Sequence, residues 1–217
     1  ALGHPELAFP SIVIAGTNGK GSVTAMVERG LRAAGYRTGR YTSPHLLHIE
    51  ERFAIDGIAI AASIFEAAAA RVLTAATTLQ APPSFFEATT ALALDVFREA
   101  RIDVAVLEVG LGGRLDATNA VDSIGVAITA VDFDHEQYLG HTLVEIATEK
   151  AGVIKPRSVV VLEDNAPEVE AVVAARCAEV GATLVRARDA TTFDATMMEG
   201  QAHLTGRTPA GNYDDLR

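Results

Sequence analysis

Residues 12–22 read Ile-Val-Ile-Ala-Gly-Thr-Asn-Gly-Lys-Gly-Ser, and this stretch decides the fold. The apolar run 12–15 predicts a buried strand, and residues 22–34 predict a helix directly after the glycines. A glycine loop between a strand and a helix is typical of proteins that hold a nucleotide polyphosphate. The first expectation is therefore a phosphate-binding loop over residues 16–22.

Each residue type in this loop suits one part of a bound nucleotide. Gly16, Gly19 and Gly21 leave room for backbone N–H groups to point inward. Lys20 supplies a positive charge for the β- and γ-phosphates. The Ser22 hydroxyl is a ligand for the accompanying Mg²⁺, and the N-terminus of the helix adds its positive dipole end.

Two departures from the strict phosphate-loop pattern leave a second interpretation open. Ile14 stands where the first glycine of the pattern belongs, and Gly21 separates Lys20 from Ser22. The alternative is a tight turn from strand to helix that carries a lysine by chance. The later stretch Gly-Leu-Gly-Gly has Leu115 at its sixth position, which argues against a dinucleotide-binding fold.

The composition limits the class of protein. The chain has 217 residues, of which 49% are hydrophobic and 21% charged, as expected for a soluble globular protein with a sizeable core. Its net charge of −10 argues against nucleic acid as a partner. The single cysteine, Cys177, fits a reducing compartment, so we expect a cytoplasmic protein. The apolar stretch 58–79 contains Ser63, Glu66 and Arg71, which argues against a membrane span.

Lysine is rare in this chain. Of the 18 basic residues, only Lys20, Lys150 and Lys155 are lysines. A position that keeps lysine where arginine is otherwise used indicates a need for a compact ammonium, or for an amine that can lose its proton. The alternative is codon bias with chance survivors, and it is strongest for Lys155.

Strands and helices are expected to alternate along the chain. The expected strands cover residues 12–15, 37–42, 104–109, 125–131, 159–162 and 184–187, and the expected helices cover 22–34, 61–79, 85–100, 143–151 and 167–180. Apolar strands with helical crossovers predict an α/β fold with a mainly parallel sheet and helices on both faces. Residues 191–197 and 201–205 flank Glu199-Gly200 and predict an antiparallel hairpin. No helix or strand is expected over the last five residues.

Three further side chains are candidates for chemistry. Glu108 ends an apolar strand, where it would face the ligand crevice of a parallel sheet and could bind Mg²⁺; an ion pair with Arg114 is the alternative. His135 follows another expected strand and could be a metal ligand or a proton carrier, although an exposed loop histidine is the plainer interpretation. Lys150 shares its helix with two glutamates, which is ordinary on a surface, and only the scarcity of lysine argues otherwise.

Taken together, these segments resemble the folylpolyglutamate synthase/dihydrofolate synthase family of Mur-ligase-like ATP-dependent amide ligases. The resemblance is carried, in family order and spacing over most of residues 3–156, by Gly-Thr-Asn-Gly-Lys-Gly-Ser (16–22), Thr-Ser-Pro-His-Leu (42–46), Phe-Phe-Glu (85–87), the run from Glu108 to Asn119, Asp134-His135, and Glu149 to Pro156. The Lys-Gly-Ser insertion that broke the general loop pattern is itself a trait of this family.

The resemblance implies roles for individual positions. It assigns ATP binding to Gly16, Thr17, Asn18, Gly19, Lys20, Gly21 and Ser22, and Mg²⁺ binding to Ser22, Glu108 and His135. It assigns folate or pteroate binding to Thr42, Ser43, Pro44, His45, Phe85 and Phe86. Catalytic roles fall to Lys20, His135 and Lys150, the last as a lysine that reacts with CO₂ to form a carbamate.

The implied reaction is ATP-driven amide bond formation. The γ-phosphoryl group would pass to a carboxylate of folate or dihydropteroate, and glutamate would attack the acyl phosphate. We expect a monomer whose residues 1–190 form the ATPase domain and whose residues 191–217 begin the remainder of that domain. The family's C-terminal glutamate-binding domain has no counterpart in this sequence, so we expect a piece of a longer polypeptide. Asp132 departs from the family pattern near the expected metal site.

Other functions stay open. The chain could bind ATP and folate without ligating, because the glutamate site has no counterpart in it. A Mur-type cell-wall ligase is a further alternative, although its loop has Thr or Ser directly after the lysine. A regulatory phosphate-loop NTPase is the last, and substrate-independent ATP hydrolysis would favour it.

Overall fold

The computed structural model describes residues 1–198, 201–208 and 210–216. Its main feature is an eight-stranded sheet with the order β4-β3-β2-β5-β1-β6-β7-β8. The strands are β1 (Ser11–Ala15), β2 (Thr38–Tyr41), β3 (Phe53–Ile55), β4 (Ile58–Ala59), β5 (Val104–Glu108), β6 (Ser123–Ile128), β7 (Val159–Leu162) and β8 (Thr183–Arg186). From β2 to β8 every neighbouring pair is parallel, which confirms the expected fold class.

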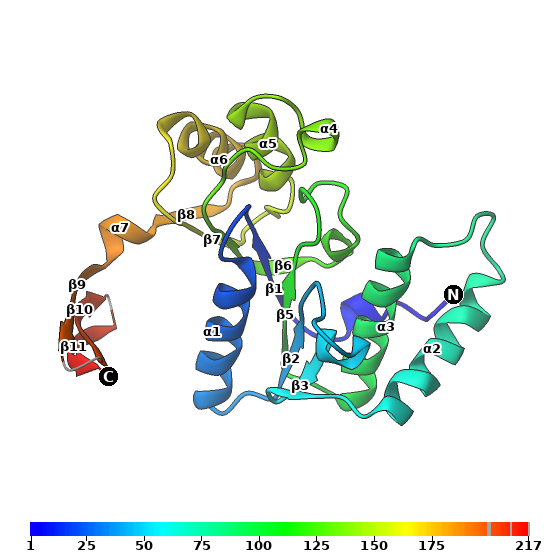
Figure 1. The fold of residues 1–217 in the computed structure, drawn as a ribbon. Coiled ribbons are helices and arrows are strands. Elements are labelled where there is room, and N and C mark those ends of the chain that lie inside the picture. Colours follow the sequence, from blue (N-terminus) through cyan, green and yellow to red (C-terminus); the bar gives the residue numbers. More distant parts are fainter. Residues whose placement is uncertain (199–200, 209, 217) are drawn as a thin grey trace.

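Helices cover both faces of this sheet. They are α1 (Lys20–Ala33), α2 (Ala62–Ala76), α3 (Phe85–Ala100), α4 (Glu136–Leu139), α5 (Leu143–Ala151), α6 (Pro167–Val180) and α7 (Ala187–Ala190), with short 3₁₀ turns η1 (Pro5–Leu7), η2 (Ile49–Arg52) and η3 (Ala117–Ala120). Figure 1 shows α1 on one face and α3 on the other, with α2 outside α3. No described helix has the length and apolar character needed to cross a membrane.

Local sequence signals explain where several helices begin. Ser84 caps α3 by accepting the Glu87 N–H, and the Glu87 carboxylate accepts the Ser84 N–H in return. Thr142 and Glu145 form the same reciprocal cap at the start of α5. All five residues of β5 are buried, as expected for a central parallel strand. β1 pairs in parallel with β5 on one side and with β6 on the other, so the carboxyl ends of these three strands meet at one edge of the sheet.

The structure corrects the expected strand 125–131. β6 ends at Ile128; the Thr129 N–H still donates to the Ala15 carbonyl of β1, and the chain then leaves the sheet because the two N–H groups after it find side-chain partners. The Ala130 N–H donates to the Glu163 carboxylate at 2.9 Å, and the Val131 N–H donates to the Asn165 side chain at 2.8 Å. The segment 129–132 is therefore a loop at the carboxyl edge of the sheet.

Two other elements differ from expectation. The short strands β3 and β4 pair antiparallel at one edge of the sheet and were not predicted. The expected C-terminal hairpin is a three-stranded antiparallel sheet of β9 (Thr192–Met198), β10 (Gln201–Thr208) and β11 (Gly211–Leu216), so the expectation that no strand ends the chain was wrong. The predicted turn at Glu199-Gly200 lies outside the described residues. Figure 1 shows this small sheet standing away from the main body.

Candidate nucleotide and substrate site

The glycine loop lies between β1 and α1, at the carboxyl edge of the sheet. Gly16 has a φ of 145°, and a Cβ there would stand 1.9 Å from the Thr129 Oγ1. Gly19 has a φ of 83° and occupies the N-cap position of α1. Both positions therefore require glycine, one for space and both for conformation. These glycines therefore allow both the turn from strand to helix and the close packing of the loop against Thr129.

The loop is fastened to the segment that follows β6. The Thr17 N–H donates to the Ala130 carbonyl at 2.7 Å, and the Thr17 hydroxyl donates to the Asp132 carbonyl at 3.0 Å. The Thr129 hydroxyl donates to the Asn18 carbonyl at 2.6 Å. Sequence reasoning missed Thr129, because a threonine at the end of a strand carries no pattern of its own. These contacts fix the loop from the side of β6.

Asp132, the departure near the expected metal site, is occupied locally. Its carboxylate accepts the N–H of Phe133, the next residue, at 2.8 Å. Its backbone N–H donates to the Thr17 hydroxyl at 3.1 Å. Asp132 thus helps to fix the glycine loop through its backbone, while its carboxylate is hydrogen-bonded to the backbone of the next residue.

Lys20 folds back over the glycine loop. Its ammonium donates to the carbonyls of Gly16 and Thr17, both at 3.1 Å. The side chain is half-buried and also lines a pocket of about 900 Å³ beside the loop. A cation held on two backbone carbonyls at the end of a parallel strand is placed to contact a phosphate bound by the loop.

Glu108 ends β5 with only 5% of its surface exposed. Its carboxylate accepts the Ser43 N–H at 3.1 Å, and a Cβ on Gly21 would lie 3.7 Å from both of its oxygens. Burial raises the pKa of Glu108, against the smaller opposing effects of the Ser43 N–H and of the Lys20 and Arg40 charges. A buried carboxylate with no ion pair in the described part of the chain is a strong candidate for a cation ligand.

The ion pair considered as an alternative for Glu108 is not formed. Arg114 instead pairs with Glu149, with a guanidinium nitrogen 2.9 Å from the carboxylate. This also takes one of the two glutamates on the Lys150 helix away from the lysine. The other, Glu145, caps the start of that helix.

Lys150 points inward from α5 and is 2% exposed. Its ammonium donates to the Gly16 carbonyl at 2.8 Å, the same oxygen that Lys20 contacts. Burial, and then repulsion by Lys20, lower the pKa of Lys150 to about 8, with a smaller opposing effect from Asp134. An amine with that pKa is partly neutral near physiological pH. The plainer interpretation of Lys150 as a surface residue is therefore wrong.

His135 is an exposed member of the proposed metal ligands. It stands at the start of α4 with a φ of 46°, its side chain is 52% exposed, and its Nε2 lies 3.5 Å from an oxygen of Asp134. No group of three or more His, Cys, Asp or Glu side chains in the described residues could hold a metal ion. Joint metal binding by Ser22, Glu108 and His135 therefore stays a proposal.

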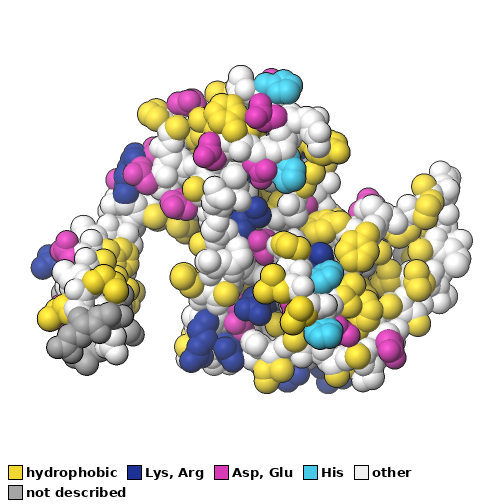
Figure 2. Space-filling model, in the orientation of Figure 1, with side chains coloured by type: hydrophobic (Ala, Val, Ile, Leu, Met, Phe, Trp, Pro, Cys, Tyr) yellow, Lys and Arg dark blue, Asp and Glu magenta, His cyan; other side chains and the backbone are white. Residues whose placement is uncertain are grey.

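A pocket of about 900 Å³ brings several predicted residues together. Six of them line it, namely Lys20, Ser43, Pro44, Phe85, Phe86 and His135. Thr42 and His45 are not among the lining residues, but both contact Arg52, which is: the Thr42 N–H donates to the Arg52 carbonyl, and His45 accepts a hydrogen bond from the Arg52 side chain. Figure 2 shows hydrophobic side chains gathered over α3 and the loops beside it.

The same pocket contains residues that sequence reasoning missed. Asp116 lines it and organises the neighbouring loop, since its carboxylate accepts the N–H groups of Gly110, Leu111 and Thr118 at 2.9–3.0 Å. Arg52 is 7% exposed and also lines the pocket. In the sequence it follows two glutamates and looks like part of a charged surface. Only the tertiary structure reveals its burial.

The two predicted aromatic residues have different surroundings. Phe85 is 58% exposed and lies under the Arg52 guanidinium, 5.3 Å from its ring centroid. Phe86 packs on Tyr41 with ring centroids 5.9 Å apart, and a Cβ on Gly110 would come within 2.5 Å of its ring. The Phe85 ring is thus more accessible to a flat ligand than the Phe86 ring, which belongs partly to the core.

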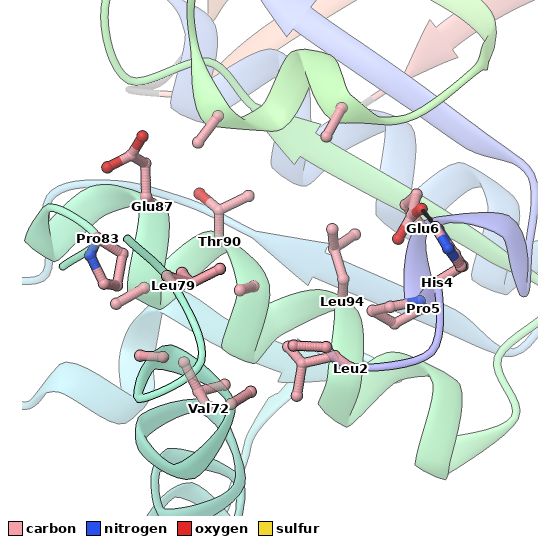
Figure 3. Close-up of a pocket in the computed structure, with 17 residues that line it drawn as sticks. Leu2, His4, Pro5, Glu6, Val72, Leu79, Pro83, Glu87, Thr90 and Leu94 are labelled. Carbon is pink, nitrogen blue, oxygen red and sulfur yellow. Dashed lines mark hydrogen bonds and ion pairs between the residues drawn. The ribbon is translucent and has the colours of Figure 1, made fainter. Parts of the chain in front are cut away.

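A second, smaller pocket of about 300 Å³ opens between α2, α3 and the N-terminal segment (Figure 3). Its wall is mainly aliphatic, with Leu2, Val72 and Leu94 around the space in Figure 3. Its titratable side chains already have partners: His4 and Glu6 lie 2.8 Å apart, and the Glu87 carboxylate accepts the Ser84 N–H at the start of α3. The larger pocket beside the glycine loop is therefore the better candidate for the functional site.

Comparison with known proteins identifies relatives of this arrangement. No family model matches the chain. It is 38% identical over 220 residues to folylpolyglutamate synthase of Lacticaseibacillus casei, an alignment that covers 99% of this chain and 50% of that protein. It superposes on a folylpolyglutamate synthase–AMPPCP–folate complex with a TM-score of 0.95 and 36% identity, over 99% of this chain and 54% of that one.

An Escherichia coli FolC structure with DHPP and ADP is also similar, with a TM-score of 0.87 and 32% identity over 99% of this chain and 51% of that one. The chain spans about half the length of the curated relatives it matches. Over the part of those proteins that it spans, the chain belongs to the folylpolyglutamate synthase/dihydrofolate synthase family.

Proposed function

We propose that this chain binds Mg²⁺-ATP at the glycine loop and folate or dihydropteroate in the adjacent pocket, as part of an ATP-dependent ligase that adds glutamate. The observation that carries the proposal is the convergence of Lys20 and Lys150 on the Gly16 carbonyl, beside the buried carboxylate of Glu108. Relatives that share this fold were solved with AMPPCP and folate, or with ADP and DHPP.

The glycine loop and Lys20 would hold the phosphates. Backbone N–H groups at the start of α1 and the Lys20 ammonium are directed at the carboxyl edge of the sheet, where negative charge is favoured. During transfer of the γ-phosphoryl group to the substrate carboxylate, charge accumulates on the transferring oxygens. Fixed donors at this edge would stabilise that charge without reorganising.

Mg²⁺ would be held by Glu108, Ser22 and His135. When bound, the ion would neutralise part of the charge of the phosphates. The fit rests on the buried carboxylate of Glu108 beside Gly21, which has no ion-pair partner among the described residues, because Mg²⁺ prefers oxygen ligands. Ser22 lies in the first turn of α1, next to Gly21. His135 shares the pocket with Lys20.

Lys150 would carry a carbamate. The ammonium would first lose a proton, and the neutral amine would then attack CO₂, forming a nitrogen–carbon bond and releasing a second proton. A buried cation would thereby become an anion. The lowered pKa of about 8 supplies the neutral amine. The Lys20 charge that disfavours a second ammonium would favour this anion instead. Lys150 points inward while Glu145 and Glu149 are engaged elsewhere, as the reaction requires.

The pocket would hold the flat ring system of the substrate. The exposed Phe85 ring offers a stacking face, and Ser43 and Pro44 form the wall on the side of Glu108. A substrate bound there would place its carboxylate toward the glycine loop, because Lys20 lines the same pocket.

Binding of the nucleotide is tested by calorimetry with Mg²⁺-ATP. The Lys20→Ala chain should lose detectable binding, because the variant removes the charge that contacts the phosphates. Lys155→Ala is the matched control, since Lys155 also donates to a backbone carbonyl, that of Asn119 at 3.0 Å, away from the loop. Unchanged affinity in Lys20→Ala would remove the loop from the mechanism.

Ligation is tested separately, by mass spectrometry of folate incubated with ATP, glutamate and the 217-residue chain. We expect binding without glutamate addition, because the glycine loop accounts for the nucleotide and the adjacent pocket for the folate, and neither accounts for glutamate. Glutamylated product would show that the chain is a complete ligase. ATP hydrolysis that does not depend on folate would instead favour a regulatory NTPase.

A further inference from the structure

The loop that supplies Ser43 and Pro44 to the pocket continues through residues 45–48 without regular structure. Leu46 and Leu47 are 89% and 82% exposed, so packing of their side chains does not hold this loop. Its conformation must come from polar contacts. Two neighbouring residues of η2, Glu51 and Arg52, supply them.

Glu51 holds the backbone of the loop. Its carboxylate accepts the N–H of Leu46 at 2.8 Å, of Leu47 at 3.0 Å and of His48 at 2.8 Å. These bonds, first those from His48 and Leu46, lower the pKa of Glu51. Three consecutive N–H groups on one carboxylate define the turn, because the loop can satisfy all three only in one conformation.

Arg52 holds the loop from the inside. Its Nε donates to the Nδ1 of His45 at 2.8 Å, and its guanidinium lies over the Phe85 ring. In the described part of the chain it forms no ion pair, although it is 7% exposed. Because His45 accepts at Nδ1, the proton of its neutral ring is on Nε2. Arg52 thus sets both the place and the tautomer of His45.

We propose that Glu51 and Arg52 are positioning residues that together preorganise the loop 43–48 at the wall of the substrate pocket. We call this pair the loop clasp. Its effect on folate rests on the proposed function, whereas its effect on the loop does not. A loop ordered before binding loses less conformational freedom when the ligand arrives, so the clasp should favour folate binding while leaving ATP binding at the glycine loop unchanged.

Hydrogen exchange of the 217-residue chain tests the carboxylate half of the clasp. Glu51→Gln should speed exchange of the Leu46, Leu47 and His48 amides about tenfold or more, because the acceptor loses its charge and one of its two oxygens becomes an NH₂ group that cannot accept. Glu50→Gln is the matched control, being the neighbouring glutamate of the same turn. Equal exchange at these amides in both variants would overturn the clasp.

Arg52→Lys tests the other half, because it keeps a positive charge and removes the Nε donor. ¹⁵N NMR of the histidine rings should show His45 leaving the single Nε2–H tautomer, while the signal of His48 stays as it was. An unchanged His45 signal would overturn the role of Arg52. This readout also decides the matter if Glu51→Gln fails to fold.

Calorimetry then connects the clasp with the pocket. Both Glu51→Gln and Arg52→Lys should weaken folate binding about tenfold or more, and Mg²⁺-ATP affinity should stay within about twofold. Folate affinity equal to wild type in both would overturn the positioning role. A wild-type chain that binds no folate would overturn the proposed function instead, and the exchange and NMR results would still decide on the clasp.

Discussion

Two regions of the molecule treat charge in opposite ways: the inner edge, where Glu108 and Lys150 are buried beside the glycine loop, and the rim, the helical turns outside the pocket that carry Glu51 and Glu145. At the inner edge, burial raises the pKa of Glu108 and lowers that of Lys150 to about 8, so both charged forms are disfavoured. At the rim, backbone N–H donors lower the pKa of Glu51 and Glu145, so their charged forms are favoured. The rim carboxylates order their own turns by accepting backbone N–H groups. Within the part of the chain that the structure describes, the inner groups Glu108 and Lys150 lack an oppositely charged partner, which a bound ligand would supply.

This difference distinguishes residues that stabilise the fold, Glu51 and Glu145, from residues that are available for function, Glu108 and Lys150. Glu51 and Glu145 have their donors from the chain itself, so they need nothing else. Glu108 has one N–H donor and no ion pair among the described residues, and Lys150 has one carbonyl. Buried groups left in this state destabilise a protein unless a ligand or a reaction completes them.

The largest effect is expected for Lys150→Arg, measured as ligase activity in a complete enzyme that contains this chain. Arginine stays protonated and cannot form a carbamate, so activity should fall about 100-fold or more. The fold, followed by circular dichroism, should persist. Lys155→Arg is the control and should be milder. Full activity in Lys150→Arg would contradict the carbamate role and would show that the lowered pKa of Lys150 at the inner edge is not needed for the reaction.

Gly16→Ala should have the next largest effect, on stability. Its Cβ would meet the Thr129 hydroxyl at 1.9 Å in a backbone conformation that alanine avoids, so unfolding should become easier by about 3 kcal/mol. Gly35→Ala, with a φ of 92° and no atom within 4 Å, controls for conformation alone and should cost about 1 kcal/mol. Equal costs by chemical denaturation would show that the loop is not tightly fitted.

A smaller effect distinguishes the two carboxylates by the sign of their pH dependence. The raised pKa of Glu108 means that the folded state binds its proton more tightly, so wild type should lose stability relative to Glu108→Gln as pH rises above 4.5. The lowered pKa of Glu51 means the reverse, so wild type should lose stability relative to Glu51→Gln as pH falls below 4.5. Denaturation series of both variants that drift in the same direction would remove the contrast between edge and rim.

Local signals explain what the sequence could predict. The bounds of α3, α5 and α6 agreed with expectation because capping residues, or a proline at the first helical position, mark their starts. The mainly parallel sheet followed from continuous apolar strands. The phosphate-loop interpretation followed from the strand, glycine and helix order of 12–22.

Tertiary contacts explain what the sequence could not predict. The hairpin of β3 and β4 has strands of three and two residues, too short for a pattern. The loop 129–132 leaves the sheet because Glu163 and Asn165, more than thirty positions away, bind its N–H groups. Arg52 looks exposed in a charged run, and its burial depends on His45 and Phe85.

The most direct test of the contrast uses the scarcity of lysine. With ¹³C-labelled lysine the chain has only three side-chain signals, from Lys20, Lys150 and Lys155, and single Lys→Arg variants assign them. In a pH titration by NMR, the Lys150 signal should titrate near pH 8, well below 10.5, because burial and Lys20 disfavour its charge. A Lys150 signal that titrates near 10.5 would contradict the account, since the inner edge would then hold an ordinary ammonium and no amine ready to react.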